Sequence, residues 1–440
     1  MLRSGKKIAM VAAAAVAAIG LYGCGNSKSS SSSSDSGSKK VTIRFSWWGN
    51  DDRHKDTLKA IKDFEKKNPN IKVKAEYAGW DGYPEKVATQ MSGGTEADLM
   101  QTNYDWYTTY SSDGDGYADL SKFKDIIDMS GFPKKLMKMG NLNGKQVGLV
   151  YGENSSVFFV NKTVYNKAGV TTYPKTWDEY ADVAKKLGKG KYAMVIPNYF
   201  QVLTYMQQKT GKGMLSNSGK MQYTKKDFKD GFDWYQGLTD KGITSSYKWN
   251  LNTFGTSSLT SVKEFTNGTI AGSFDWNGNL ATYATNLKQV NDEIAIPSYP
   301  TVEGAKTDGV MKKPSMCFSI SKHSDAKKQK AAAKLLNFLM NNKTGVKDMG
   351  MSRGMPANTK AVKILEDAGK VDAVSKAAYE YGKKTTGIYQ SPYIAIEAVQ
   401  SAYNDVFEAF GTGSISSSEA ASQMMTKIPA AVKQAKASQK

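Results

Sequence analysis

The chain has 440 residues, of which 40% are hydrophobic and 23% are charged. This balance is typical of a globular protein and excludes a collagen-like, coiled-coil or wholly disordered chain. The sequence holds only two cysteines and two histidines. We therefore predict no disulfide framework, no multi-histidine metal site and no cofactor.

The net charge of +19 is carried almost entirely by lysine, because only four arginines occur in the chain. Proteins that read nucleic acids rely on arginine for bidentate contacts with bases and phosphates. We therefore predict no nucleic-acid partner and expect a solvated lysine surface that faces an anionic cell envelope.

The N-terminus has the features of a secretory signal. A cationic segment precedes an apolar run at 8–21, which suits a signal peptide and is too short to span a bilayer. The run ends in Leu-Tyr-Gly-Cys, which resembles the lipobox of bacterial lipoproteins. We predict a signal peptide at 1–23, lipidation of Cys24 and a flexible serine-rich tether over 24–40. The protein is then anchored by lipid alone at the outer face of the cytoplasmic membrane.

The globular part opens with a predicted strand, helix and strand. Residues 41–47 and 71–77 alternate apolar and polar side chains, which predicts two half-buried strands. Apolar residues recur at helical spacing between them, with Asp51 or Asp52 as the candidate N-cap and Asn68 at the end. Two strands joined by a helix predict a parallel sheet, and hence an α/β protein.

Further along the chain the same two patterns recur. A capping box at Thr176 and Glu179 predicts a helix start, and an apolar face over 332–339 predicts another helix. Alternation over 316–320 predicts a strand in which Cys317 is a small buried hydrophobe. The last hundred residues are predicted to be mostly helical.

The search for catalytic motifs finds no phosphate-binding loop, dinucleotide fingerprint, zinc-protease motif or serine-hydrolase elbow. A glycosidase-type pair of carboxylates stays open, because its spacing is set in space and leaves little trace in sequence. Instead, tryptophan and tyrosine stand beside small polar residues at 47–50, 79–83, 103–106 and 275–279. Sugar sites combine a flat aromatic ring with amide or charged groups, so these runs favour carbohydrate binding.

The ordered series of motifs resembles the extracellular solute-binding proteins of bacterial carbohydrate ABC importers, the group similar to maltose- and oligosaccharide-binding lipoproteins (family 1). The resemblance covers nearly the whole chain after residue 40. The segments that carry it are 43–49, 64–71, 97–101, 143–149, 160–162, 173–179, 265–271 and 354–357.

The resemblance implies a two-lobed α/β fold of the periplasmic-binding-protein type, with crossover hinge segments and a sugar bound between the lobes. The implied first lobe comprises 41–151 and 314–341, and the second comprises 152–313 and 342–440. The candidate ligand-binding residues are Trp48, Asn50, Arg53, Gln101, Asn103, Tyr104, Glu153, Asn154, Tyr199, Trp276, Asn277 and Arg353.

The resemblance further implies a monomer that binds a sugar, most simply an oligosaccharide, and delivers it unchanged to the permease subunits of an importer. Two alternatives stay open: a surface glycoside hydrolase, and a glycan-binding adhesin without a transport role. Arg53 and His54 beside the first strand suit an acidic sugar, and they equally suit a structural role at the helix start.

Overall fold

The computed structural model describes residues 40–111, 115–255 and 259–437, which belong to one compact unit. The predicted signal peptide, Cys24 and nearly all of the tether lie outside the described residues. In the part of the chain that the structure describes, no helix is both long enough and apolar enough to cross a membrane.

The first three elements confirm the predicted strand–helix–strand unit. Strands β1 (Val41–Trp48) and β2 (Ile71–Ala78) pair in parallel and are joined by helix α1 (Asp51–Lys67). The predicted N-cap is wrong by one or two positions. The cap is Asn50, whose side chain accepts a hydrogen bond from the backbone N–H of Arg53.

The first sheet has five strands in the order β2-β1-β3-β11-β6. The added strands are β3 (Leu99–Thr102), β11 (Cys317–Ile320) and β6 (Leu149–Val150). Strand β3 is parallel to β1, and β11 runs antiparallel to both β3 and β6. The predicted strand around Cys317 is confirmed, and the thiol is fully buried. A separate hairpin pairs β4 (Asn141–Leu142) with β5 (Lys145–Gln146).

The second sheet has the order β12-β10-β7-β8, and β9 also pairs with β7. Its strands are β12 (Ile388–Tyr389), β10 (Met311–Pro314), β7 (Glu153–Asn161), β8 (Gly272–Trp276) and β9 (Ile294–Ala295). Strand β7 is antiparallel to β8, β9 and β10. The strands β7, β8 and β10 therefore bring their ends at Glu153, Trp276 and Pro314 to one edge of the sheet.

Each sheet has its own hydrophobic core, so the predicted two-lobed α/β fold is confirmed. The buried cluster of the first sheet draws on residues between Ile43 and Ala357, and two others surround the second sheet. The helices on the first sheet's side are α1, α2 (Tyr83–Ser92), α3 (Trp106–Thr109), α4 (Lys134–Met137), α12 (Ala326–Asn341), α13 (Lys343–Met349) and α14 (Thr359–Asp367).

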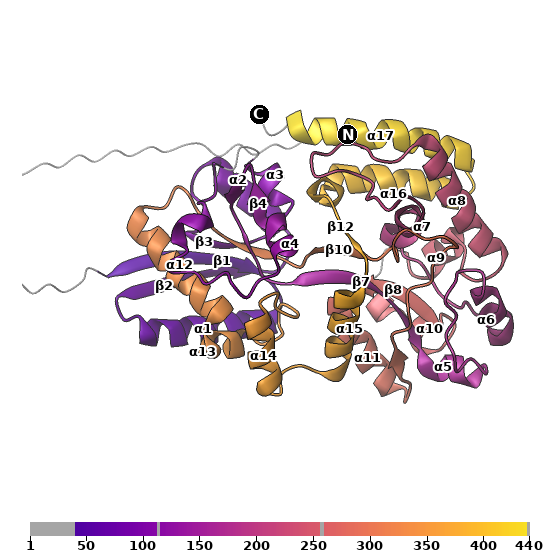
Figure 1. Cartoon of the computed structure of the whole chain (residues 1–440), viewed down its shortest axis with the longest axis horizontal. Helices are drawn as coiled ribbons and strands as arrows, with labels where there is room; N and C mark the ends of the chain where they lie inside the picture. The colour runs from indigo at the N-terminus through magenta and orange to yellow at the C-terminus, as the bar shows by residue number, and fades with distance from the viewer. Residues whose placement is uncertain (1–39, 112–114, 256–258, 438–440) are drawn as a thin grey trace, which may run out of the picture. The chain divides into compact units, whose positions relative to one another are not determined.

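The helices on the second sheet's side include the long C-terminal pair, which Figure 1 shows side by side. They are α5 (Lys162–Lys167), α6 (Tyr180–Leu187), α7 (Gln201–Thr210), α8 (Lys225–Asp240), α9 (Tyr247–Thr253), α10 (Lys263–Thr266), α11 (Leu280–Gln289), α15 (Ala373–Lys384), α16 (Glu397–Gly411) and α17 (Ser417–Ala437). The mostly helical C-terminus and the helix over 332–339 are confirmed as predicted.

Two local expectations differ from the structure. Helices α13 and α14 pack with α1 and α12, whereas we expected residues from 342 onward in the second lobe. The capping box at Thr176 forms in part: the carboxylate of Glu179 accepts the backbone N–H of Thr176 at 3.0 Å, but Trp177 donates its backbone N–H to Thr301 and α6 begins only at Tyr180. In both places the structure is set by contacts between segments that are far apart in the sequence.

Two of the segments that cross between the sheets, 151–153 and 314–316, are hydrogen-bonded to each other and to a segment around Ala357 that links α13 and α14. Backbone N–H groups join Tyr151 to the oxygen of Met316 at 2.9 Å and Ser315 to the oxygen of Gly152 at 2.8 Å. The N–H of Ala357 donates to the oxygen of Tyr151 at 2.6 Å. Two crossover segments and the segment around Ala357 therefore form one bonded strip.

Candidate functional site

Asn50 and Arg53 have partners within the first lobe. The side chain of Asn50 caps α1, and Arg53 donates from Nε to the oxygen of Ser352 at 3.0 Å and from Nη1 to the oxygen of Trp48 at 3.1 Å. Burial lowers the pKa of Arg53. His54 accepts a hydrogen bond from the indole of Trp47 at 3.1 Å. These contacts fit a structural role for Arg53 and His54 at the helix start, which is one of the two roles that the sequence left open.

Gln101 and Arg353 form a buried polar link. Arg353 is 2% exposed, and it donates from Nε to Gln101 at 2.8 Å and from Nη1 to Thr57 at 2.9 Å. Gln101 in turn donates to the oxygen of Trp48 at 3.2 Å. Burial lowers the pKa of Arg353 to about 9, and the charge of nearby Arg53 acts in the same direction. This link holds the segment around Arg353 against β1 and β3.

Glu153 and Asn277 are tied into the second sheet. The hydroxyl of Tyr389 donates to the carboxylate of Glu153, and the ammonium of Lys312 lies 3.9 Å from it. Asn277 accepts the backbone N–H of Ser155 at 3.3 Å and donates to the backbone oxygen of Glu153 at 3.4 Å.

Trp48 is 8% exposed and belongs to an aromatic cluster at the end of β1. Its ring centroid lies 5.2 Å from that of Trp80, 5.3 Å from that of Trp106 and 5.6 Å from that of Tyr83. Trp80 is the exposed member, at 46%. Most of the surface of Trp48 is therefore used in packing.

Trp276 and Tyr199 face a lysine that the sequence did not single out. The ammonium nitrogen of Lys313, on β10, lies 4.4 Å from the ring centroid of Trp276 and 5.8 Å from that of Tyr199. The two rings pack edge to face at 5.6 Å. Asn154 is the direct cross-strand partner of Lys313, so the two side chains project to the same face of the sheet. An aromatic corner and a cation thus meet at one edge of the second sheet.

The charge of Lys313 is only loosely balanced. Its ammonium forms no hydrogen bond and no ion pair with the residues that the structure describes. Burial lowers its pKa, and the more distant carboxylates of Asp105 and Asp275 act against this. Asp275 already accepts hydrogen bonds from Tyr283 at 2.9 Å and from Asn279 at 3.0 Å.

Asp105 and Tyr104 bring the first lobe to this site. Burial raises the pKa of Asp105 to about 7, against the opposing charge of Lys313. Tyr104 is 5% exposed, and its hydroxyl has no hydrogen-bond partner among the described residues. Asn103, just before it, is half-buried and accepts the backbone N–H of Trp106 at 3.1 Å. Electrostatic coupling links Tyr104 to Tyr199, so the two lobes approach each other here.

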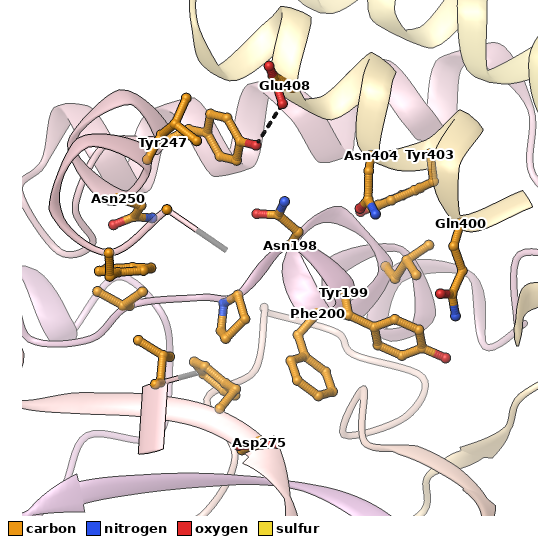
Figure 2. A pocket seen from close by; sticks show the side chains of 18 of the residues that line it. Asn198, Tyr199, Phe200, Tyr247, Asn250, Asp275, Gln400, Tyr403, Asn404 and Glu408 are labelled. Carbon is orange, nitrogen blue, oxygen red and sulfur yellow. Dashed lines mark hydrogen bonds between the residues drawn. The ribbon is translucent and has the colours of Figure 1, made fainter. Parts of the chain in front are cut away.

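Two cavities adjoin this region. One of about 490 Å³ lies in the second lobe, and Tyr199 and Asp275 form part of its wall. Figure 2 shows it between the turn η3 (Asn198–Phe200), helix α9 and helix α16. The other measures about 300 Å³ and lies beside the crossover segments. It is lined by five of the predicted residues: Arg53, Glu153, Asn154, Asn277 and Arg353.

Lys313 and Asp105 are the site residues that sequence reasoning missed. Lys313 is one of many lysines in the chain, and only the pairing of β10 with β7 brings it beside Trp276. Asp105 lies within the aromatic run 103–106, and this run is the sequence signal that points to it. Among the described residues no cluster of three or more His, Cys, Asp or Glu side chains is suited to a metal ion.

Known proteins resemble this chain over most of its length. A periplasmic oligogalacturonide-binding protein from Yersinia enterocolitica, solved with saturated digalacturonic acid, is 33% identical, with a TM-score of 0.78 over 90% of this chain and 100% of that one. A periplasmic solute-binding protein from Pectobacterium atrosepticum is also 33% identical, with a TM-score of 0.81 over 90% and 99%. The diacetylchitobiose-binding protein DasA of Streptomyces coelicolor is 32% identical over 29% of each chain.

The family model described as bacterial extracellular solute-binding protein matches residues 59–378. This span runs from within α1 to within α15 and includes every strand of the two sheets except β1 and β12. The chain belongs to the bacterial extracellular solute-binding protein family.

Proposed function

We propose that this protein is the sugar-binding component of a bacterial ABC importer and that its ligand carries a carboxylate. Membership of the solute-binding family and the sugar-binding relatives support the first part. The relative that was solved with a digalacturonic acid supports the second. The ligand class that we propose is an oligosaccharide containing a uronic acid.

The observation that carries this proposal is the position of Lys313. A lysine without an ion pair in the described part of the chain, set over the rings of Trp276 and Tyr199, offers both parts of an acidic sugar site. The ring surfaces that the ammonium does not cover provide flat platforms for the C–H face of a pyranose. The ammonium provides a charge-assisted hydrogen bond to a carboxylate, which is about twice as strong as a neutral one.

Binding is expected to couple to lobe closure. Asp105 and Tyr104 come from the first lobe, while Lys313, Tyr199 and Trp276 come from the second. A sugar that touches both groups gains its full contact only when the lobes approach. It therefore shifts the population toward the closed form. The closed form is the state that we propose is presented to the permease.

Calorimetric titration of the purified protein with digalacturonate and with a neutral disaccharide tests the proposal. We expect digalacturonate to bind and the neutral sugar to bind at least tenfold more weakly, because a hydrogen bond to a charged group contributes about 1.5–3 kcal/mol. The Lys313→Met variant should lose that difference. The matched control is Lys330→Met, which removes an exposed lysine on α12. Equal binding of both sugars, unaffected by Lys313→Met, contradicts the acidic part.

A glycoside hydrolase is the second candidate, and one observation favours it. Asp105, with a pKa of about 7, is able to hold a proton near neutral pH as a general acid must. We propose binding without turnover. Incubation of the protein with oligogalacturonides, followed by an assay for new reducing ends, separates the two. Release of reducing ends that stops in Asp105→Asn favours the hydrolase.

We further propose that the protein acts as a monomer, lipidated at Cys24, on the outer face of the cytoplasmic membrane. The motif at the N-terminus supports the anchor. Replacement of the lipid acceptor in Cys24→Ser should move the protein from the membrane fraction to the medium. Equal membrane retention of both forms contradicts the anchor and leaves sugar binding unaffected.

A further inference from the structure

The 490 Å³ cavity of the second lobe has a size within the range of small-ligand sites. Its walls combine aromatic rings and amides. The ring of Tyr247 comes from one side, and the amides of Gln400 and Asn404 come from α16 on another (Figure 2). The ring of Phe254 also lines the cavity. This is the same combination of flat rings and amide groups that carbohydrate recognition needs.

The amides that reach the cavity are available for a ligand. The side chains of Gln400 and Asn404 form no hydrogen bond with the residues that the structure describes. Tyr403, which also lines the cavity, has a buried hydroxyl without a partner among them. Buried polar groups in folded proteins are nearly always hydrogen-bonded, so an unpaired hydroxyl beside a cavity calls for a partner.

The charges around the cavity differ in sign from those beside Lys313. Among the described residues that line it are two carboxylates, Asp275 and Glu408, and no lysine, arginine or histidine. Glu408 accepts a hydrogen bond from Tyr247 at 3.4 Å, and Asp275 accepts one from Tyr283. A second uronate placed here would meet two negative charges and no cation. The lining therefore favours a neutral sugar.

The cavity and the lysine site share a wall. Tyr199 lines the cavity, and its ring centroid lies 5.8 Å from the ammonium of Lys313. Asp275, which lines the cavity, acts electrostatically on the same lysine. The two places therefore lie next to each other, with Tyr199 contributing to both.

We propose that the second-lobe cavity binds a neutral sugar unit that is linked to the uronate at Lys313. The ligand is then a mixed oligosaccharide of acidic and neutral units rather than a chain of uronates alone. This inference rests on the proposed function, since it takes the acidic unit at Lys313 as given. The amides of Gln400 and Asn404 bind the hydroxyls of the neutral unit.

The test compares three probes by calorimetric titration: galacturonate, digalacturonate and galacturonosyl-rhamnose. The test variant is Gln400→Ala/Asn404→Ala, which removes both amides from α16. Alanine favours a helix, so folding should be preserved, and a thermal melt checks this. The control is Ser401→Ala, at an exposed position of the same helix that does not line the cavity.

We expect galacturonosyl-rhamnose to bind about tenfold more tightly than digalacturonate, as one or two hydrogen bonds allow. The double variant should lose that advantage while galacturonate binding and the Ser401→Ala control stay unchanged. Tighter binding of digalacturonate, or a double variant that binds every probe like the wild type, overturns the inference. In that case a loss of galacturonate binding in Lys313→Met still upholds the proposed function. Failure of the wild-type protein to bind any probe overturns both.

Discussion

Lys313 is a cation in surroundings that are mostly aromatic and apolar, and this has a cost for folding. Burial is the largest influence on its pKa and lowers it, so desolvation of the charge outweighs its attraction to Asp105 and Asp275. Such a group is retained for what it binds and not for stability. The same lysine that we expect to hold the ligand therefore weakens the ligand-free protein.

Replacement of this lysine separates the two effects. In the absence of ligand, Lys313→Met should raise the free energy of unfolding at pH 7 by about 1 kcal/mol, because a desolvated charge becomes an apolar side chain of similar length. Urea denaturation of both proteins measures the change, with Lys330→Met as the control. A lower stability for Lys313→Met shows that the attraction to the carboxylates outweighs desolvation.

The raised pKa of Asp105 predicts that the stability of the protein depends on pH. Its pKa is about 7 in the folded protein, against about 3.9 for an unperturbed aspartate, so the folded state binds more protons between these values. The contribution of this carboxyl to stability is present below pH 4 and is lost as the pH rises through 7. Asp105→Asn should therefore match the wild type at pH 4 and exceed its free energy of unfolding at pH 8 by on the order of 2 kcal/mol.

Urea denaturation at pH 4, 6 and 8 measures this difference. Asp405→Asn, at an exposed position of α16, is the matched control and should show no widening gap. A gap between Asp105→Asn and the wild type that stays constant with pH contradicts the raised pKa.

At this scale the sequence pointed to the aromatic half of the proposed site and not to the charged half. Trp276 and Tyr199 stand out because a rare residue type or a family motif marks them. Lys313 does not, because nothing local distinguishes it from the other lysines of a chain with 60 basic residues. Its role depends on which strands pair, and that is set by contacts far apart in the sequence.

Helix α1 is the element that local sequence predicted best. The alternation of β1 and β2 and the helical spacing between them are properties of short segments, and all three elements were confirmed. The exact cap was not predicted, because Asn50, Asp51 and Asp52 are all good N-cap residues and only the backbone conformation selects one. At Thr176 the contact with Glu179 forms, but the helix begins later than predicted, since Thr301 pairs with the backbone of Thr176.

The cap gives a prediction that decides between two roles for Asn50. Its side chain accepts the N–H of Arg53 at 3.1 Å, so Asn50→Ala should lower the free energy of unfolding by about 1 kcal/mol. Asn50→Asp keeps an acceptor and should stay near the wild type. Ligand affinity should change by less than about twofold in both, as titration measures. A large loss of affinity with unchanged stability assigns the side chain to the ligand instead.

For the whole molecule, the order of motifs predicted two lobes, but it did not predict which residues belong to each lobe. Residues 343–367 pack with the first lobe through α1 and α12, so the chain returns to the second lobe only between α14 and α15. Such packing depends on surfaces that exist only after the first sheet has formed. The close contact of two crossover segments with the segment around Ala357 likewise leaves no local pattern in the sequence.

Gly152 lies where that contact is tightest. A Cβ at this position would lie 2.5 Å from the backbone oxygen of Met355 and 2.9 Å from the hydroxyl of Ser315, so the two crossover segments and the segment around Met355 would have to move apart. Gly152→Ala should therefore lower the free energy of unfolding by about 1–3 kcal/mol. It should also weaken sugar binding, because the closed state that the ligand selects becomes less populated.

Urea denaturation and calorimetric titration with digalacturonate measure the two effects on the same protein preparations. Gly237→Ala is the matched control, because a Cβ there meets no atom within 4 Å and the position lies inside α8. That variant should keep its affinity and gain stability, since alanine is the better helix former. If Gly152→Ala loses stability but keeps full affinity, the hinge strip supports the fold without controlling closure. Only a loss of both stability and affinity shows that the crossover segments take part in ligand binding.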